Sequence, residues 1–427
     1  MKQNIGNLVI IVLVILNIVV WLVFPPVNDG RPNFLRQYAG EVIGANNIIL
    51  MATSLFLSTR PKWAEKYFGG LDKMYMTHRR TGTAAFLLIF VHVLTVPITT
   101  TGWALGNYLA VIAFTGIISI VLITLAPRIP FLSRLAGNDY DDWKKLKRWI
   151  GIFFILAFIH SLTIPNPLHA LVAITWVQVF FIIGTISYLY TEVFGRFFKK
   201  YVPYTVEAVK HPNPSSTEVT MRPKKEPIKK HRAGQFLFVR FPGQKDLNES
   251  HPFTISSAPA EDVLRLTIKA SGNFTRELFH KLKEGAEAVI EGAYGMFNYK
   301  TGGPNQIWIA GGIGLTPFLS FVRDMDGNLQ QNVDLYYTVR HPEEAIFVDE
   351  LEAADAKNRC LNVHIRYSAK EGSLTVEDIL KNTGVNNISG YDIYLCGPLP
   401  MMQSFEKKFI ELGLPQHNIH YEEFNFR

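Results

Sequence analysis

Three histidines stand in or beside apolar segments of the N-terminal half, and imidazole is a side chain that can bind iron or carry protons. His92 lies inside the run Phe90–Leu94, His78 precedes that run in a basic stretch, and His160 ends the run Ile155–His160. Fourteen residues of helix would separate His78 from His92 by roughly 21 Å and return them to nearly the same face. Each imidazole would then lie near one side of a hydrocarbon core about 30 Å thick. Because ionisable side chains in a membrane are costly, a functional role is the first hypothesis, and a buried histidine bonded to a neighbouring helix is the alternative.

Two neutral imidazoles that face each other across a helix bundle form a natural site for haem iron. Such a site leaves the iron no open position and suits it to electron transfer. The pair His92 and His160 fits this description if both side chains lie at the same depth. A proton relay through the same histidines is a rival functional hypothesis, and a purely structural pair is the third. His169, beside Pro167, is predicted to be a surface histidine.

The elements that position these histidines are predicted to be six membrane-spanning helices. The hydrophobic fraction of 48% is that of an ordinary globular protein, but the apolar runs are concentrated in the N-terminal half. The first run follows Lys2, lacks a small-residue cleavage site and leads into Pro25-Pro26, so it is interpreted as a retained span. The predicted spans are Leu8–Phe24, Val42–Leu57, Thr81–Thr100, Leu109–Ala126, Trp149–Ile164 and Leu168–Phe194.

The basic residues of this half gather in two loops, at 60–80 and 127–148, whereas the 97–108 and 165–170 turns contain no Lys or Arg. The positive-inside rule therefore predicts a cell-membrane protein with both chain ends in the cytoplasm. It also makes spans three and five run outward, which brings His92 and His160 to similar depth. The net charge of +7 thus reflects membrane topology and predicts no nucleic-acid partner. Two cysteines, both in the C-terminal half, predict neither a disulfide framework nor a CxxC metal site.

After Phe194 the pattern changes to short alternating strands, typical of a small antiparallel barrel. The predicted strands are Thr205–Val209, Phe236–Arg240 and Leu264–Ile268. Within this region, His251-Pro252-Phe253-Thr254 continues to Ser257, and its aromatic ring and hydroxyl groups could hold the flat ring and polar edge of a flavin. A plain strand leaving a turn would look similar. Downstream, Ser271-Gly272-Asn273-Phe274-Thr275 precedes a helix, where backbone N–H groups can hold a diphosphate.

From Gln306 onward, buried strands alternate with helices. The strand Gln306–Ala310 leads into Gly311-Gly312-Ile313-Gly314-Leu315-Thr316-Pro317. A strand, a glycine-rich turn and a helix start suit a nucleotide phosphate, although the spacing is not GxGxxG. Further strands are predicted at Val333–Val339, Val363–Tyr367 and Tyr391–Leu395. The last one ends in Cys396-Gly397-Pro398, at the edge where open α/β sheets bind ligands.

These motifs together resemble a known family. From about Tyr201 to Arg427 the chain resembles the ferredoxin–NADP reductase fold. The His-Pro-Phe-Thr motif and the six predicted spans make the whole chain similar to the NADPH oxidase and ferric reductase superfamily. The resemblance implies a helical haem domain at 1–198, an antiparallel β-barrel FAD domain at 199–302 and a Rossmann-like NAD(P) domain at 303–427.

The resemblance also implies roles for single residues. His251, Pro252, Phe253, Thr254 and Ser257 would contact the flavin, and Gly272, Asn273, Phe274 and Thr275 its diphosphate. The dinucleotide would be held by Gly311, Gly312, Gly314, Thr316 and Pro317, with Cys396, Gly397 and Pro398 beside the nicotinamide. Phe424 would cover the flavin face, with Phe426 the less favoured candidate. His92 and His160 would bind a haem b.

One departure concerns the inner haem, which the resemblance would place on His78. Family members usually carry a partner histidine where this chain has Lys147, so whether a second haem is bound stays an open question. Lysine ligates only when deprotonated, against a reference pKa of about 10.4.

Arg340 or Arg366, each at a strand end, could pair with a 2′-phosphate and favour NADPH over NADH.

The predicted function is transmembrane transfer of electrons from NAD(P)H through FAD and haem b to oxygen or ferric iron outside. The alternatives are a non-redox transporter or sensor with proton-relay histidines and a nucleotide-binding tail, or a relay subunit for an external protein. Nothing in the sequence points to an obligatory protein partner.

Overall fold

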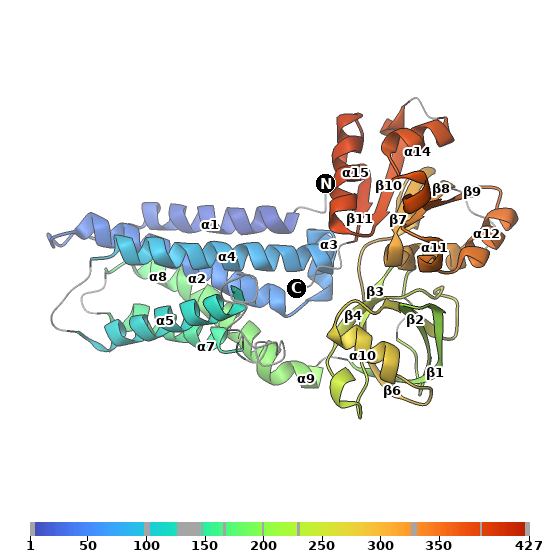
Figure 1. The fold of residues 1–427 in the computed structure, drawn as a ribbon. Helices are drawn as coiled ribbons and strands as arrows, with labels where there is room; N and C mark the ends of the chain where they lie inside the picture. Colours follow the sequence, from blue (N-terminus) through green and yellow to red (C-terminus); the bar gives the residue numbers. More distant parts are fainter. Residues whose placement is uncertain are drawn as a thin grey trace. The chain divides into compact units, whose positions relative to one another are not determined.

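The computed structural model describes residues 5–97, 103–125, 146, 148–164, 168–198, 200–228, 231–325, 331–384 and 387–422. The chain forms two compact units that divide after Phe198: a helical unit and a C-terminal unit of strands and helices (Figure 1).

The helical unit is built from long apolar helices. Its helices are α1 (Ile5–Val23), α2 (Phe34–Ser58), α3 (Lys62–Phe68), α4 (Leu71–Thr95), α5 (Leu105–Leu125), α7 (Ile150–Thr163), α8 (Leu171–Leu189), a π-helical turn η3 (Tyr190–Phe194) and α9 (Gly195–Phe198). Helix α2 packs against α8 and α1, and α5 packs against α7. Gly116 makes the α5–α7 approach possible, because a Cβ there would lie 2.2 Å from the ring of Phe153.

Four of the described helices are long and apolar enough to cross a membrane: α1, α2, α5, and α8 continued through η3. Helix α7 is apolar but has only 14 residues. Helix α4 begins at Leu71, ten residues before the predicted span. The prediction followed the apolar run and so left out Asp72, Lys73, Arg79 and Arg80, charged residues that a helix can include. The count of six spans therefore stays a prediction.

In the C-terminal unit, the first six strands form one antiparallel sheet in the order β4-β3-β6-β1-β2-β5. They are β1 (Val202–Asn213), β2 (Ser216–Pro223), β3 (Phe236–Arg240), β4 (His251–Thr254), β5 (Leu264–Lys269) and β6 (Glu287–Tyr294). A bridge between Ile255 and Leu266 joins the segment after β4 to β5, so the two edge strands meet. The sheet thus closes like a barrel, as predicted, around buried side chains such as Val219, Leu237 and Ile290. Helix α10 (Asn273–Lys281) follows β5.

The remaining strands form a five-stranded sheet in the order β11-β10-β7-β8-β9, in which all neighbours are parallel. They are β7 (Asn305–Gly311), β8 (Asn332–Val339), β9 (Leu361–Tyr367), β10 (Tyr391–Cys396) and β11 (Ile419–Tyr421). The helices between them are α11 (Thr316–Asp324), α12 (Val348–Lys357), α13 (Ser368–Glu371), α14 (Val376–Thr383) and α15 (Leu399–Glu411), and the turn η6 spans Gly312–Leu315. The strands predicted here match β7 to β10.

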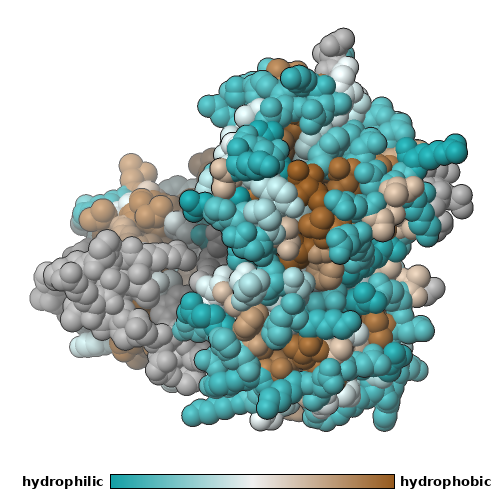
Figure 2. All heavy atoms as spheres, turned by 45° about the vertical axis from the view of Figure 1, so that its right-hand side comes forward, coloured by the Kyte–Doolittle hydropathy of each residue, from teal (hydrophilic) through white to brown (hydrophobic). Residues whose placement is uncertain are grey.

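This sheet is covered on both faces, because successive side chains of a strand point to opposite sides. In β7, Trp308 and Ala310 join the core that contains Phe318 of α11, whereas Ile307 and Ile309 join the core that contains Phe405 of α15. The arrangement is a doubly wound α/β domain. The face of the C-terminal unit seen in Figure 2 is mostly hydrophilic. In the helical unit, by contrast, side chains such as Leu22 of α1 and Leu171 of α8 are exposed.

Candidate nucleotide and haem sites

The strand order of the parallel sheet reverses between β7 and β10. The chain proceeds from β7 to β8 and β9 on one side, and to β10 and β11 on the other. In sheets of this kind, ligands bind beyond the carboxyl ends of the strands at the point of reversal. Two turns meet there, because Cys396 of β10 stands opposite Ala310 of β7 in register.

Glycines let these two turns approach each other. A Cβ at Gly314 would lie 2.3 Å from the carbonyl oxygen of Cys396, so only glycine fits without backbone movement. A Cβ at Gly397 would lie 3.0 Å from the backbone of Gly311, and Gly397 has a φ of +158°. Gly312, by contrast, has a φ of +55° and open space where a Cβ would stand. The result is a cradle in which backbone lies exposed at Gly312 while the side chains of Pro398 and Met401 approach Gly311, and such exposed backbone suits a phosphate.

Helix α11 starts directly after this cradle. Pro317 stands in its first turn, where the missing N–H costs nothing. The Thr316 hydroxyl donates to the carbonyl of Ile313 over 3.1 Å and is buried. The helix N-terminus and the open Gly312 turn therefore present partial positive charge to the same space. Gly311, Gly312, Gly314, Thr316 and Pro317 lie together at this turn, and their binding of a dinucleotide stays a prediction.

Cys396 is completely buried at the end of β10. Its burial, and secondarily the carboxylate of Glu422, raise the pKa of the thiol well above its usual value. The side chain is therefore a neutral thiol and not a thiolate nucleophile. Pro398 begins the turn into α15 and accepts hydrogen bonds from the N–H groups of Met401 and Met402 at 3.0 and 3.1 Å. Phe424 and Phe426 lie outside the described residues.

The predicted flavin strand is β4, which pairs with β3 so that Thr254 stands opposite Phe236 and Phe253 opposite Leu237. The hydroxyl oxygen of Thr254 is buried and has no hydrogen-bond partner among the residues that the structure describes. Since an unpaired buried hydroxyl is costly, such a group calls for a ligand or a water. Beyond the strand, Ser256 and Ser257 are fully buried.

An aromatic stack covers this strand. The ring of Phe274 in α10 lies 3.9 Å from that of His251 and 6.1 Å from that of Phe253, and both pairs are stacked. Thr275 ties the start of α10, since its hydroxyl oxygen accepts from the N–H groups of Ser271 and Gly272 at 3.0 and 2.9 Å. Those two N–H groups are thus already bonded, and the first N–H groups of α10, from Asn273 onward, are the ones that can meet an anion.

The structure separates the two arginines that were candidates for a 2′-phosphate. Arg366 donates from Nε to the carbonyl of Gly372 at 2.9 Å and pairs with Asp378 at 3.0 Å. A further bond of 2.8 Å reaches the carbonyl of Glu371. Arg340, at the carboxyl end of β8, is exposed, and its guanidinium has no partner among the described residues. Arg366 therefore braces its own loop, and Arg340 is available to a ligand.

In the helical unit, the three predicted haem histidines share one hydrogen-bond pattern. Nδ1 of His92 lies 2.8 Å from the carbonyl of Gly40, and Nδ1 of His160 lies 2.9 Å from the carbonyl of Gly106. Nδ1 of His78 lies 2.8 Å from the carbonyl of Ser54. A carbonyl only accepts, so each Nδ1 carries a proton, and in the neutral rings of His92 and His160 the lone pair is on Nε2. This is the tautomer of a metal-binding imidazole whose orientation is set by a second hydrogen bond.

His92 and His160 lie near enough for an electrostatic interaction between their rings. Gly44 gives the His92 ring its place against α2, because a Cβ there would lie 3.1 Å from Cε1. Lys147, the predicted replacement for an inner ligand, lies outside the described residues. No cluster of three or more His, Cys, Asp or Glu side chains forms a metal site among the residues that the structure describes. Haem ligation needs only two imidazoles.

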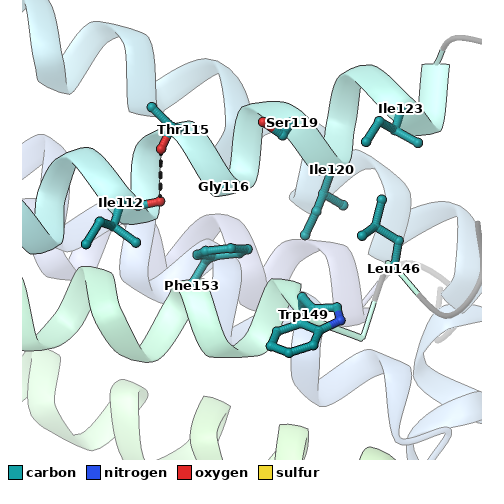
Figure 3. Close-up of a pocket in the computed structure, with 9 residues that line it drawn as sticks. All are labelled: Ile112, Thr115, Gly116, Ser119, Ile120, Ile123, Leu146, Trp149 and Phe153. Atoms are coloured by element: carbon teal, nitrogen blue, oxygen red, sulfur yellow. Dashed lines mark hydrogen bonds between the residues drawn. The ribbon is translucent and has the colours of Figure 1, made fainter.

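A pocket also lies within the helical unit. It has a volume of about 430 Å³ between α5 and α7 and is lined by apolar side chains that include Ile120, Trp149 and Phe153 (Figure 3). The hydroxyl of Thr115 is bonded within its own helix, to the carbonyls of Val111 and Ile112. None of the described residues that line this pocket is titratable, so we assign it no chemistry.

Sequence reasoning missed two residues of α11, Ser320 and Arg323, which bond to the flavin side of the unit. Ser320 donates to the carbonyl of Ser257 at 2.7 Å, and Arg323 donates to the carbonyl of Ser256 at 2.8 Å. No local pattern could have found them, because more than sixty residues separate each donor from its acceptor: 63 for Ser320 and 67 for Arg323.

Comparison with known proteins agrees with this geometry. Residues 204–304 match the family model of an FAD-binding domain, and residues 308–407 match that of an oxidoreductase NAD-binding domain. The C-terminal half thus contains an FAD-binding domain followed by an oxidoreductase NAD-binding domain.

Individual relatives cover this half. Flavohemoprotein A of Dictyostelium discoideum is 24% identical over 47% of this chain and 54% of its own length. Respiratory burst oxidase homolog protein A of Solanum tuberosum is 31% identical over 31% of this chain and 16% of its own length. The chain thus spans about half, or less, of these relatives. A flavohemoglobin from Malassezia yamatoensis with bound FAD and heme has a TM-score of 0.53 at 18% identity, covering 92% of this chain and 98% of that one, which is a likeness of fold.

Proposed function

We propose that this chain is a membrane oxidoreductase that passes electrons from NAD(P)H through FAD to a haem b between His92 and His160. From the haem they reach an acceptor on the outer side of the membrane, oxygen or ferric iron. The observation that carries the proposal is the shared state of His92 and His160: Nδ1 of each is bonded to a helix carbonyl, which orients Nε2 as the atom that could bind iron.

The dinucleotide would lie over the cradle of Gly311, Gly312 and Gly397, with its phosphates toward the N-terminus of α11. Open space at Gly312 and the close approach of Gly397 to Gly311 support this placement. Cys396, a buried neutral thiol, would form the floor beside the nicotinamide and exclude water. Phe424 would act as the cover.

FAD, when bound, accepts a hydride and releases single electrons, a chemistry that amino-acid side chains do not supply. The residues around β4 would hold and orient it. The Thr254 hydroxyl, unpaired among the described residues, would offer a hydrogen bond to its polar edge, and Phe253 would pack beside it. The first turn of α10, after Gly272, would meet the diphosphate.

Haem b, when bound, serves as a one-electron carrier across the membrane. The carbonyls of Gly40 and Gly106 would fix the orientation of the His92 and His160 rings, with Nδ1 as the donor, and so align Nε2 for it. For His78 we propose that the inner site is weak or empty, because Lys147 is protonated at neutral pH unless its pKa is strongly lowered.

The same proposal includes the membrane. Four apolar helices support it, and by the positive-inside rule the loop charges would put both termini in the cytoplasm. The domain boundaries that go with it are 1–198, 199–302 and 303–427.

Absorbance of the purified full-length chain tests the proposal. We expect bands of oxidised flavin and of haem, and anaerobic NADPH should bleach the flavin and reduce the haem. Oxygen and a ferric chelate, supplied separately, should then reoxidise the haem. A protein without flavin and haem absorbance would contradict the proposal and favour a transporter or sensor. A protein that reduces its haem but is reoxidised by neither acceptor would instead be a relay for an external partner.

A further inference from the structure

Two side chains of α11 connect the nucleotide cradle to the flavin strand. Ser320 and Arg323 stand three residues apart, so they share one face of the helix. They donate to successive carbonyls of the barrel: Ser320 Oγ to Ser257 at 2.7 Å, and the Arg323 guanidinium to Ser256 at 2.8 Å.

The acceptor segment is itself fixed within the barrel. The backbone N–H of Ser256 donates to the carbonyl of Arg265 at 2.8 Å, and its hydroxyl accepts from Thr267 at 3.0 Å. The hydroxyl of Ser257 accepts from the N–H of Arg265 at 3.2 Å. This segment begins two residues after Thr254, so any shift of Ser256 is passed directly to β4.

The Arg323 guanidinium also contacts two glutamates and an aromatic ring. It forms a two-pronged pair with Glu350 of α12, at 2.6 and 2.8 Å, and reaches Glu218 of β2 at 3.3 Å. The side chains of Arg323 and Glu218 are only 7% and 8% exposed. The guanidinium also lies 5.1 Å from the centre of the Phe347 ring.

Stability alone does not require a buried guanidinium with this many partners between two domains. Burying a charge is costly, and an apolar contact of the same size often stabilises as well or better. The planar guanidinium, with its donors in fixed directions, instead sets a defined distance and angle between the groups that it bonds. Hydride transfer depends steeply on both, since a displacement of about 1 Å can cost about 100-fold in rate.

We propose that Arg323, assisted by Ser320, is a positioning residue that sets the distance between the nicotinamide and the flavin. This inference rests on the proposed function and deepens it. Arg323 touches neither cofactor; it acts through Ser256 on β4 and through α11 on the nucleotide cradle. Its loss should therefore slow hydride transfer and leave dinucleotide binding nearly unchanged.

The test is stopped-flow reduction of the flavin in the purified full-length protein, with NADPH and with its deuterated form. Arg323→Ala should lower the limiting reduction rate by about 10-fold or more, with the Kd for NADPH changed less than about 3-fold. Added guanidinium should restore much of the rate, because it can refill the space left by the side chain. Arg323→Lys keeps the charge but lacks the fork, and should stay slow.

Two further variants keep the test decisive if Arg323→Ala is poorly folded. Ser320→Ala removes one hydrogen bond and should slow reduction severalfold with an increased deuterium effect. Arg222→Ala is the matched control, since this arginine pairs with Glu207 on the barrel surface and is 54% exposed; it should change nothing.

The inference is wrong if Arg323→Lys and Ser320→Ala reduce their flavin at the wild-type rate. It is equally wrong if the variants only lose flavin or thermal stability, and guanidinium does not restore the rate, because Arg323 would then be structural. If the wild-type protein itself does not accept hydride from NADPH or NADH, the proposed function fails, which is a separate result.

Discussion

Replacing Arg340 by alanine should shift the dinucleotide preference of the protein from NADPH toward NADH. Arg340 is exposed at the carboxyl end of β8, next to the cradle strand β7, and its guanidinium has no partner among the described residues. A hydrogen bond to a charged group contributes about 1.5–3 kcal/mol, and exposure to solvent favours the low end. About 1.5 kcal/mol corresponds to roughly a tenfold loss in kcat/KM for NADPH.

Arg366→Ala supplies the matched control, because its guanidinium is already bonded to Gly372, Glu371 and Asp378. Its removal should lower the free energy of unfolding by about 1–3 kcal/mol and leave the preference unchanged. The assay is steady-state NAD(P)H oxidation with both dinucleotides, together with thermal unfolding of both variants. The reasoning is refuted if Arg366→Ala changes the NADPH/NADH ratio and Arg340→Ala does not.

Four further outcomes are expected. His92→Ala should abolish the reduced-haem spectrum of the outer site while flavin content stays normal; an unchanged spectrum would remove His92 as a ligand. Lys147→His should raise haem content from about one to about two per chain, whereas two haems in the wild type, with one lost in Lys147→Ala, would mean lysine ligation. Phe424→Ala should ease nicotinamide access and change flavin fluorescence; no change in either would transfer the role to another aromatic. Between pH 7 and pH 9, Cys396 should be alkylated far more slowly than the partly exposed Cys360, because burial raises the pKa of its thiol; equal rates would show that the site opens.

Local sequence was sufficient wherever a few neighbouring residues decide the outcome. The alternation of Phe236–Arg240 and the buried run before Gly311 predicted strands β3 and β7, because side-chain period and β-branched or aromatic content act within one strand. The glycines of the cradle could be recognised for the same reason. A strand followed by glycines and a helix start is a local pattern with few other uses.

Other features depend on residues that are distant in the chain, and only the tertiary structure decided them. Arg340 follows the last residue of β8 and Arg366 lies near the end of β9, yet Asp378, on a later helix, pairs with Arg366. Whether a histidine keeps its Nε2 lone pair depends on the carbonyl that faces Nδ1, which for His92 lies 52 residues away.

The same holds for the link between the two halves of the flavin–nucleotide module. Arg323 meets Glu218, 105 residues earlier, in a buried pair that no sequence window contains. Sequence by itself determined which elements form and which chemistry their ends can support, since propensity, periodicity and glycine geometry are properties of neighbours. The partners of each charged or titratable side chain were decided by packing, because burial and hydrogen bonding are set by whatever residue the fold brings within about 3 Å.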